Sequence, residues 1–125
     1  MITITTDPSR KLVRTHMAGF LEVSDVAAFS RDEQAAVAAM GLTSGEFLLL
    51  VETSECMIQS QAVVAAFQDI ILNSPYKARR IAIVREGSMS RLQTNRIVAI
   101  RENAAVFLTS ADAEAWLFED ARAAA

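Results

Sequence analysis

The chain has 125 residues, a net charge of −3 at neutral pH and a hydrophobic content of 52%. This length fits a single domain, residues 1–125, and this composition can fill a core, which excludes a disordered chain. The single cysteine excludes an internal disulfide, and one cysteine with one histidine cannot build a zinc site. Because no long apolar run and no leader pattern occur, we expect a cytoplasmic protein without a transmembrane segment.

The first elements in chain order are two strands. Residues 2–5 alternate apolar and polar side chains, and residues 12–18 alternate again before Gly19. The short turn that begins at Asp7 predicts that the two strands form an antiparallel hairpin.

A helix over residues 25–40 is predicted next, with Ser24 as its N-cap and Gly41 at its end. Its apolar positions recur at helical spacing, and Glu33 is the one polar residue among them. This face predicts packing against the sheet.

The stretch from Phe47 to Val64 organises the rest of the chain. Five consecutive apolar residues, 47–51, predict a strand over residues 46–52 that is buried on both faces. We expect a polar elbow over residues 52–59, and then a helix that is capped by Ser60 and stopped near Pro75.

Two more strands and two more helices complete the predicted order. The apolar runs 81–84 and 104–108 predict strands, residues 90–102 predict a helix, and Thr109 or Ser110 caps a final helix. The order ββαβαβαβα predicts an α/β fold with a mainly parallel five-stranded sheet and an antiparallel edge strand. Ligands of such sheets bind at the carboxyl ends of the strands, here residues 53–59, 85–90 and 109–110.

This order of elements resembles the STAS fold of anti-sigma-factor antagonists and sulfate-transporter tails. Gly19-Phe20-Leu21-Glu22 followed by Asp25 resembles the pattern that leads into the first helix of the SpoIIAA-like branch. Residues 114–117, Glu-Ala-Trp-Leu, resemble the Ala-x-Trp-Leu ending of that branch. The resemblance implies a regulatory module that binds protein partners. Some members of the wider fold hold nucleotides or lipids, and lipid-transfer domains of the CRAL-TRIO type share the topology.

The phospho-switch of the family reads Asp-Ser-Ser-Gly-Leu, and the matching stretch here reads Gln59-Ser60-Gln61-Ala62-Val63. Aligned without gaps, Gln61 stands where the family has its phosphorylated serine. We therefore expect that the switch does not carry over.

Candidate ligand- or partner-binding residues lie at the carboxyl rim and on the predicted helix 90–102. Ser60 is either a plain N-cap or an anion-binding hydroxyl, and Arg96, within an apolar face, either covers that face or lines an anion-binding pocket. The candidate positions are Cys56, Met57, Gln59, Ser60, Gln61, Ser88, Met89, Arg91, Arg96 and Val98.

No catalytic or nucleotide-binding motif occurs, and His16 has no partner that the sequence identifies. We therefore expect no enzyme activity, no cofactor and no metal. The arginines of helix 90–102 do not share one stripe, which argues against nucleic acid as a partner.

The leading hypothesis is a non-catalytic regulatory or protein-interaction module that forms a homodimer. The alternative is a carrier or sensor of a small apolar or amphipathic acid, a lipid-like ligand.

Overall fold

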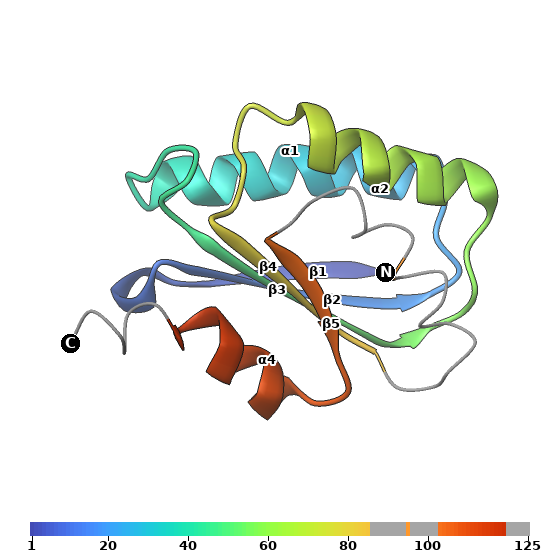
Figure 1. Cartoon of the computed structure of the whole chain (residues 1–125). Helices are drawn as coiled ribbons and strands as arrows, with labels where there is room; N and C mark the ends of the chain where they lie inside the picture. The colour runs from blue at the N-terminus through green and yellow to red at the C-terminus, as the bar shows by residue number, and fades with distance from the viewer. Residues whose placement is uncertain (86–94, 96–102, 120–125) are drawn as a thin grey trace.

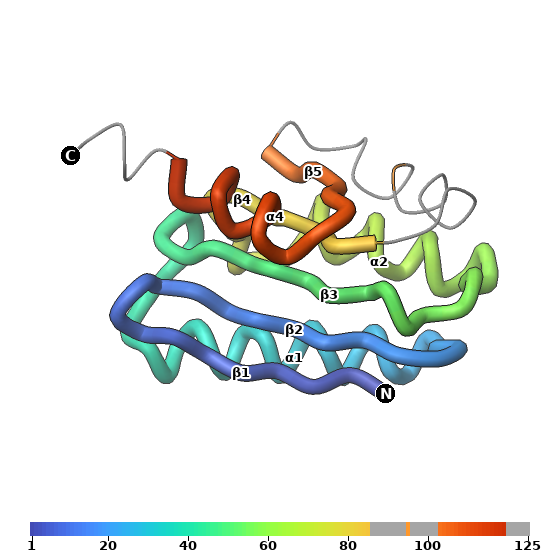
Figure 2. The backbone as a smooth tube through the Cα atoms, turned by 90° about the horizontal axis from the view of Figure 1, so that it is seen from below, coloured from blue at the N-terminus to red at the C-terminus, as the bar shows by residue number. Residues whose placement is uncertain are grey.

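The computed structural model describes residues 1–85, residue 95 and residues 103–119. Its five strands form one sheet in the order β1-β2-β3-β4-β5, which Figure 2 shows from below. The β1–β2 pair is antiparallel and the other three pairs are parallel, which confirms the predicted hairpin and fold class. The strands are β1 (Ile2–Asp7), β2 (Leu12–Gly19), β3 (Leu48–Cys56), β4 (Arg80–Val84) and β5 (Ala104–Phe107).

The helices cover both faces of this sheet. Figure 1 shows α1 (Val23–Ala39) and α2 (Gln61–Asn73) on one face and α4 (Ser110–Leu117) on the other. A short 3-10 turn, η1 (Pro8–Arg10), links β1 to β2. The helix predicted over residues 90–102 lies outside the described residues. No helix in the described ranges is long and apolar enough to cross a bilayer.

Two apolar clusters lie on opposite faces of the central strand β3. Leu49 and Val51 belong to the cluster under α1 and α2, whereas Leu48 and Leu50 belong to the cluster under α4. Successive side chains of a strand point to opposite faces, so a strand covered on both sides reads as an unbroken apolar run. This geometry confirms the prediction made from residues 47–51.

β3 is longer than the sequence predicts. The predicted strand ended at Glu52 and a polar elbow followed, but the strand continues to Cys56. β2 runs alongside and pairs His16 with Glu52 and Gly19 with Cys56. Backbone hydrogen bonds to β2 therefore keep these polar residues extended, and the connection to α2 shrinks to residues 57–60.

The N-terminus of α1 also differs from the prediction. Glu22, not Ser24, is the N-cap, and it forms a capping box with Asp25. The Asp25 carboxylate accepts a hydrogen bond of 2.8 Å from the Glu22 backbone N–H. This reciprocal pair satisfies two orphan donors, whereas a serine cap satisfies one. At the other end, Gly41 has a φ of +72°, as expected for a residue that ends a helix.

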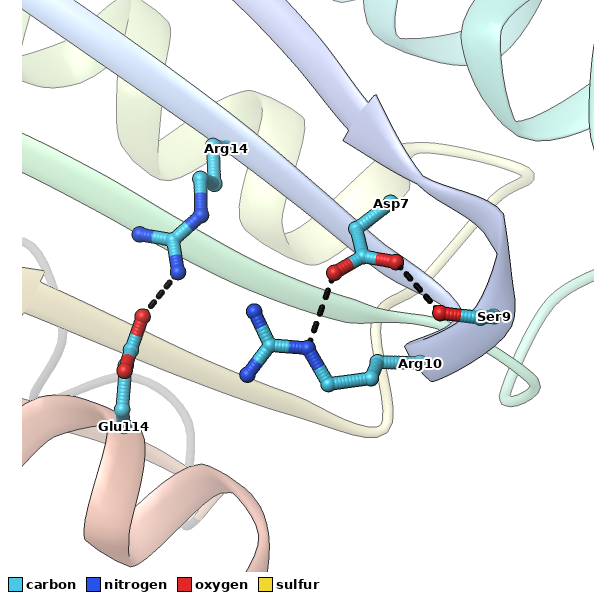
Figure 3. A network of polar contacts seen from close by, with 5 residues as sticks. All are labelled: Asp7, Ser9, Arg10, Arg14 and Glu114. Atoms are coloured by element: carbon cyan, nitrogen blue, oxygen red, sulfur yellow. Dashed lines mark hydrogen bonds and ion pairs between the residues drawn. The ribbon is translucent and has the colours of Figure 1, made fainter.

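α4 is fastened to the sheet by charged side chains. Arg14 on β2 forms an ion pair with Glu114 on α4, as Figure 3 shows. The Arg80 guanidinium lies 4.8 Å from the centroid of the Trp116 ring and donates a hydrogen bond of 2.6 Å to the Trp116 carbonyl oxygen. These contacts fix α4 over the strands that bury its apolar face.

The turn between β1 and β2 has its own polar network. Asp7 accepts hydrogen bonds of 2.8 Å from both Arg10 and Ser9 (Figure 3). The hydrogen bond from Arg10 is the main cause that lowers the pKa of the Asp7 carboxyl below its ordinary value. The Arg10 guanidinium also lies 4.9 Å from the centroid of the Phe118 ring, just beyond α4.

Candidate functional site

The carboxyl ends of β2 and β3 are joined by the side chain of Gln59. Its Oε1 accepts a hydrogen bond of 2.7 Å from the Leu21 N–H, and its Nε2 donates to the carbonyl oxygens of Gly19, at 3.0 Å, and Met57, at 2.6 Å. The Met57 N–H also donates to the Gly19 carbonyl oxygen at 3.1 Å. The loop before α1 and the loop before α2 are therefore held together as one surface.

Large apolar side chains are exposed on these two loops and at the first residue of α1. Phe20, Val23, Met57 and Ile58 are between 49% and 63% exposed. We call these four residues the apolar rim. Contiguous exposed apolar surface commonly marks a binding site for a protein or ligand.

Ser60 and Gln61 form the start of α2. The Ser60 hydroxyl accepts a hydrogen bond of 3.2 Å from the Val63 N–H and caps the helix, as its position predicts. Gln61 is the first helical residue and is exposed. A capping role accounts for the position of Ser60 without any further chemistry.

A cavity of about 110 Å³ lies between the sheet and the layer formed by α1 and α2. α2 packs mainly against α1, and Val63 is its only fully buried residue. Its apolar side chains Phe67, Ile70 and Ile71 instead line the cavity. The sheet contributes apolar walls from β3 and β4, including Leu49, Val51, Ile81 and Ile83.

Arg85 is a cavity residue that the sequence analysis did not single out. It follows β4 directly, and its backbone N–H donates to the Phe107 carbonyl oxygen at 2.9 Å. The residue is 6% exposed and lines the cavity, and one Nη donates to the Thr53 carbonyl oxygen. Its Nε has no hydrogen-bond partner within the described part of the chain. The signal available in the sequence is an arginine immediately after the apolar run 81–84, the buried part of β4.

Cys56 lines the same cavity at the end of β3 and is partly buried. Burial raises the pKa of its thiol above the ordinary value, and the positive charge of Arg85 acts in the opposite direction. The thiol is therefore protonated at neutral pH, which makes it a poor nucleophile.

Glu33 is the buried carboxylate of this region. It lines the cavity from α1, is 6% exposed and is engaged in an interaction of its own. The sequence marked it as the polar residue on an otherwise apolar helix face. Over the described ranges, no three potential metal ligands come together.

The predicted site is thus brought together only in part. Cys56, Met57 and Gln59 meet at the cavity, whereas Ser60 and Gln61 lie beside it and do not line it. The structure adds Arg85 and Glu33, which the candidate set did not include. The remaining candidates, Ser88, Met89, Arg91, Arg96 and Val98, lie outside the described residues.

No family model and no curated protein sequence match this chain. Solved structures do match it. An uncharacterised protein of the DUF3478 family from Shewanella loihica PV-4, with a SpoIIAA-like fold, superposes with a TM-score of 0.71 at 19% identity. The match covers 94% of this chain and 92% of that chain.

Two anti-sigma factor antagonists share the fold at lower identity. The one from Mycobacterium paratuberculosis has a TM-score of 0.61 at 13% identity, with 94% of each chain covered. SpoIIAA in its unphosphorylated form has a TM-score of 0.58 at 10% identity, with 98% of each chain covered. These likenesses confirm the STAS/SpoIIAA-like fold that the sequence motifs suggested.

Proposed function

We propose that this protein is a non-catalytic regulatory module that binds a protein partner through the apolar rim. The observation that supports this function is the exposure of the apolar rim, on two loops that Gln59 holds together and at the start of α1. Burying these side chains against a partner removes apolar surface from water, which is the main favourable term in protein association.

The polar contacts of Gln59 make this surface suitable for binding. Its three hydrogen bonds order both loops before a partner arrives. A preorganised surface loses less conformational entropy on association than a flexible one. The fold is shared with anti-sigma factor antagonists, which gives the proposal a structural precedent.

Ile58→Gln tests this proposal, and Leu72→Gln is the matched control. Ile58 is 54% exposed on the rim, whereas Leu72 is 51% exposed near the far end of α2. We expect affinity capture from cells that express the chain, followed by quantitative mass spectrometry, to lose a specific partner with Ile58→Gln and to retain it with Leu72→Gln. A set of captured proteins that is the same for both variants contradicts a role for the rim.

The same surface is proposed to serve self-association. Sedimentation at high micromolar concentration is expected to show a homodimer for the wild type and Leu72→Gln, and a larger monomer fraction for Ile58→Gln. A wild-type monomer at this concentration contradicts the homodimer and leaves a heterologous partner as the occupant of the rim.

The cavity favours a second candidate function, carriage or sensing of a small apolar or amphipathic acid. Its walls are apolar, and Arg85 supplies a buried cation. Ligand sites in proteins are commonly apolar cavities with a few polar groups that orient the ligand.

A further inference from the structure

We propose that the cavity binds a short-chain monocarboxylic acid, whose carboxylate pairs with Arg85 and whose hydrocarbon chain lies between α2 and the sheet. This inference rests on the carrier function and specifies its ligand class and its anchoring residue. It is independent of partner binding at the apolar rim.

The first step is the incomplete pairing of Arg85. A guanidinium stays charged at every physiological pH and presents five donors. Here one Nη donates to the Thr53 carbonyl oxygen, the Nε has no partner, and none of the ion pairs among the described residues includes Arg85. A buried charge without a counterion is unfavourable, so this position favours an anionic ligand.

The second step is the number of charges around the cavity. Arg85 is the buried cation among the described lining residues, while Lys77, which also lines the cavity, is exposed. Glu33 contributes a buried carboxylate to the same lining. A dianion such as phosphate or a dicarboxylate would have one of its two negative charges balanced by Arg85 and would also be repelled by the Glu33 carboxylate. The single charge of a monoanion is balanced by Arg85 alone. The charges therefore favour a monocarboxylate.

The third step is the shape of the walls. Phe67, Ile70 and Ile71 of α2 face Val51 and Ile83 of the sheet across the cavity. These side chains offer no hydrogen-bond partner, so the part of the ligand that they surround must be apolar. A carboxylate at Arg85 with a hydrocarbon chain along these walls satisfies both ends of the site.

The fourth step is size. An apolar cavity of about 150 Å³ in another protein encloses benzene, which has about six heavy atoms. The cavity here is smaller, about 110 Å³. It therefore encloses fewer heavy atoms than benzene has, which is enough for the carboxylate and the first carbons of an acid. The remaining carbons of an acid of about four to six carbons would reach the exposed side chain of Met57, which also lines the cavity.

The test is a titration of the full chain with hexanoate and with its uncharged analogue hexanamide, followed through the methyl NMR signals of Ile70 and Ile83. We expect hexanoate to shift both signals and to bind at least tenfold more tightly than hexanamide, because only the carboxylate pairs with Arg85. We expect butyrate to bind about tenfold more weakly than hexanoate, since each CH₂ that is removed from water contributes about 0.8 kcal/mol. Decanoate is expected to bind no more tightly than hexanoate, because its carbons beyond Met57 stay in water.

Arg85→Gln is expected to abolish the preference for hexanoate over hexanamide. The matched control, Arg79→Gln, removes the same charge from an exposed position and is expected to keep that preference. The wild-type comparison alone decides the proposal if Arg85→Gln does not fold.

Each result has one meaning. Equal binding of hexanoate and hexanamide overturns the Arg85 anchor and leaves an apolar carrier. Much tighter binding of decanoate overturns the short-chain assignment. No methyl shift with any of these probes overturns both this inference and the carrier function.

Discussion

At the scale of single residues, three side chains define the candidate site. Gln59 orders the loops by hydrogen bonds, Arg85 adds a buried charge to the cavity lining, and Cys56 adds a thiol to the same lining. Each owes its role to neighbours that are distant in sequence. Arg85, for example, reaches the carbonyl oxygen of Thr53, 32 residues away.

The thiol of Cys56 offers a test of this environment. Because burial raises its pKa, we expect the alkylation rate by iodoacetamide to be half-maximal at a higher pH than in the urea-unfolded chain. Arg85→Gln is expected to move that midpoint to still higher pH, because it removes a charge that lowers the pKa. Arg79→Gln is the control. A folded-state midpoint equal to that of the unfolded chain contradicts this assignment.

At the scale of elements, α2 is the least buried of the described α-helices. It is fully buried only at Val63, and it depends on Ser60 to satisfy its first turn. A helix whose apolar face borders a cavity gains less from packing than one that lies flat on a sheet. Its capping interaction is therefore a large fraction of its local stability.

Ser60→Ala measures this cap. We expect the free energy of unfolding, from urea titration, to fall by about 1 kcal/mol, because the Val63 N–H loses its acceptor. Ser60→Asp keeps an acceptor at the N-terminus and is expected to retain most of the stability. Equal stability of Ser60→Ala and the wild type would show that the cap contributes little.

At the scale of the whole molecule, the sheet separates two cores of different character. The face under α4 is filled by residues such as Leu12, Leu50 and Leu117, whereas the face under α1 and α2 contains the cavity. The face under α4 is therefore closely packed, whereas the larger buried cluster under α1 and α2 leaves a cavity.

Leu117→Ala tests that division. Leu117 is fully buried, so its truncation is expected to lower the free energy of unfolding by about 2–5 kcal/mol. Leu108→Ala, at a residue 51% exposed, is the control and is expected to change it by less than about 0.5 kcal/mol. We expect urea unfolding curves to show this difference, and similar midpoints for both variants would contradict a closely packed α4 face.

The sequence by itself determined the order of the strands and helices that the described residues form. The apolar run 47–51, the cap Ser60, the stop near Pro75 and the cap at Thr109 or Ser110 each act over a few neighbouring residues. The structure confirms the first three and assigns the last cap to Thr109. The alternation of the first two strands likewise sufficed for the hairpin. Such signals are local, so they can be read without knowing which segments meet.

The tertiary structure decided what depends on residues far apart in the chain. Pairing with β2 extended β3 to Cys56. The packing of α1 and α2 over the sheet left the cavity, which Arg85 and Glu33 line as buried residues. The N-cap of α1 is Glu22 and not the predicted Ser24, because Glu22 and Asp25 form a reciprocal capping box. Burial and strand pairing depend on contacts among many residues that are far apart in the chain. A local sequence pattern therefore does not predict them.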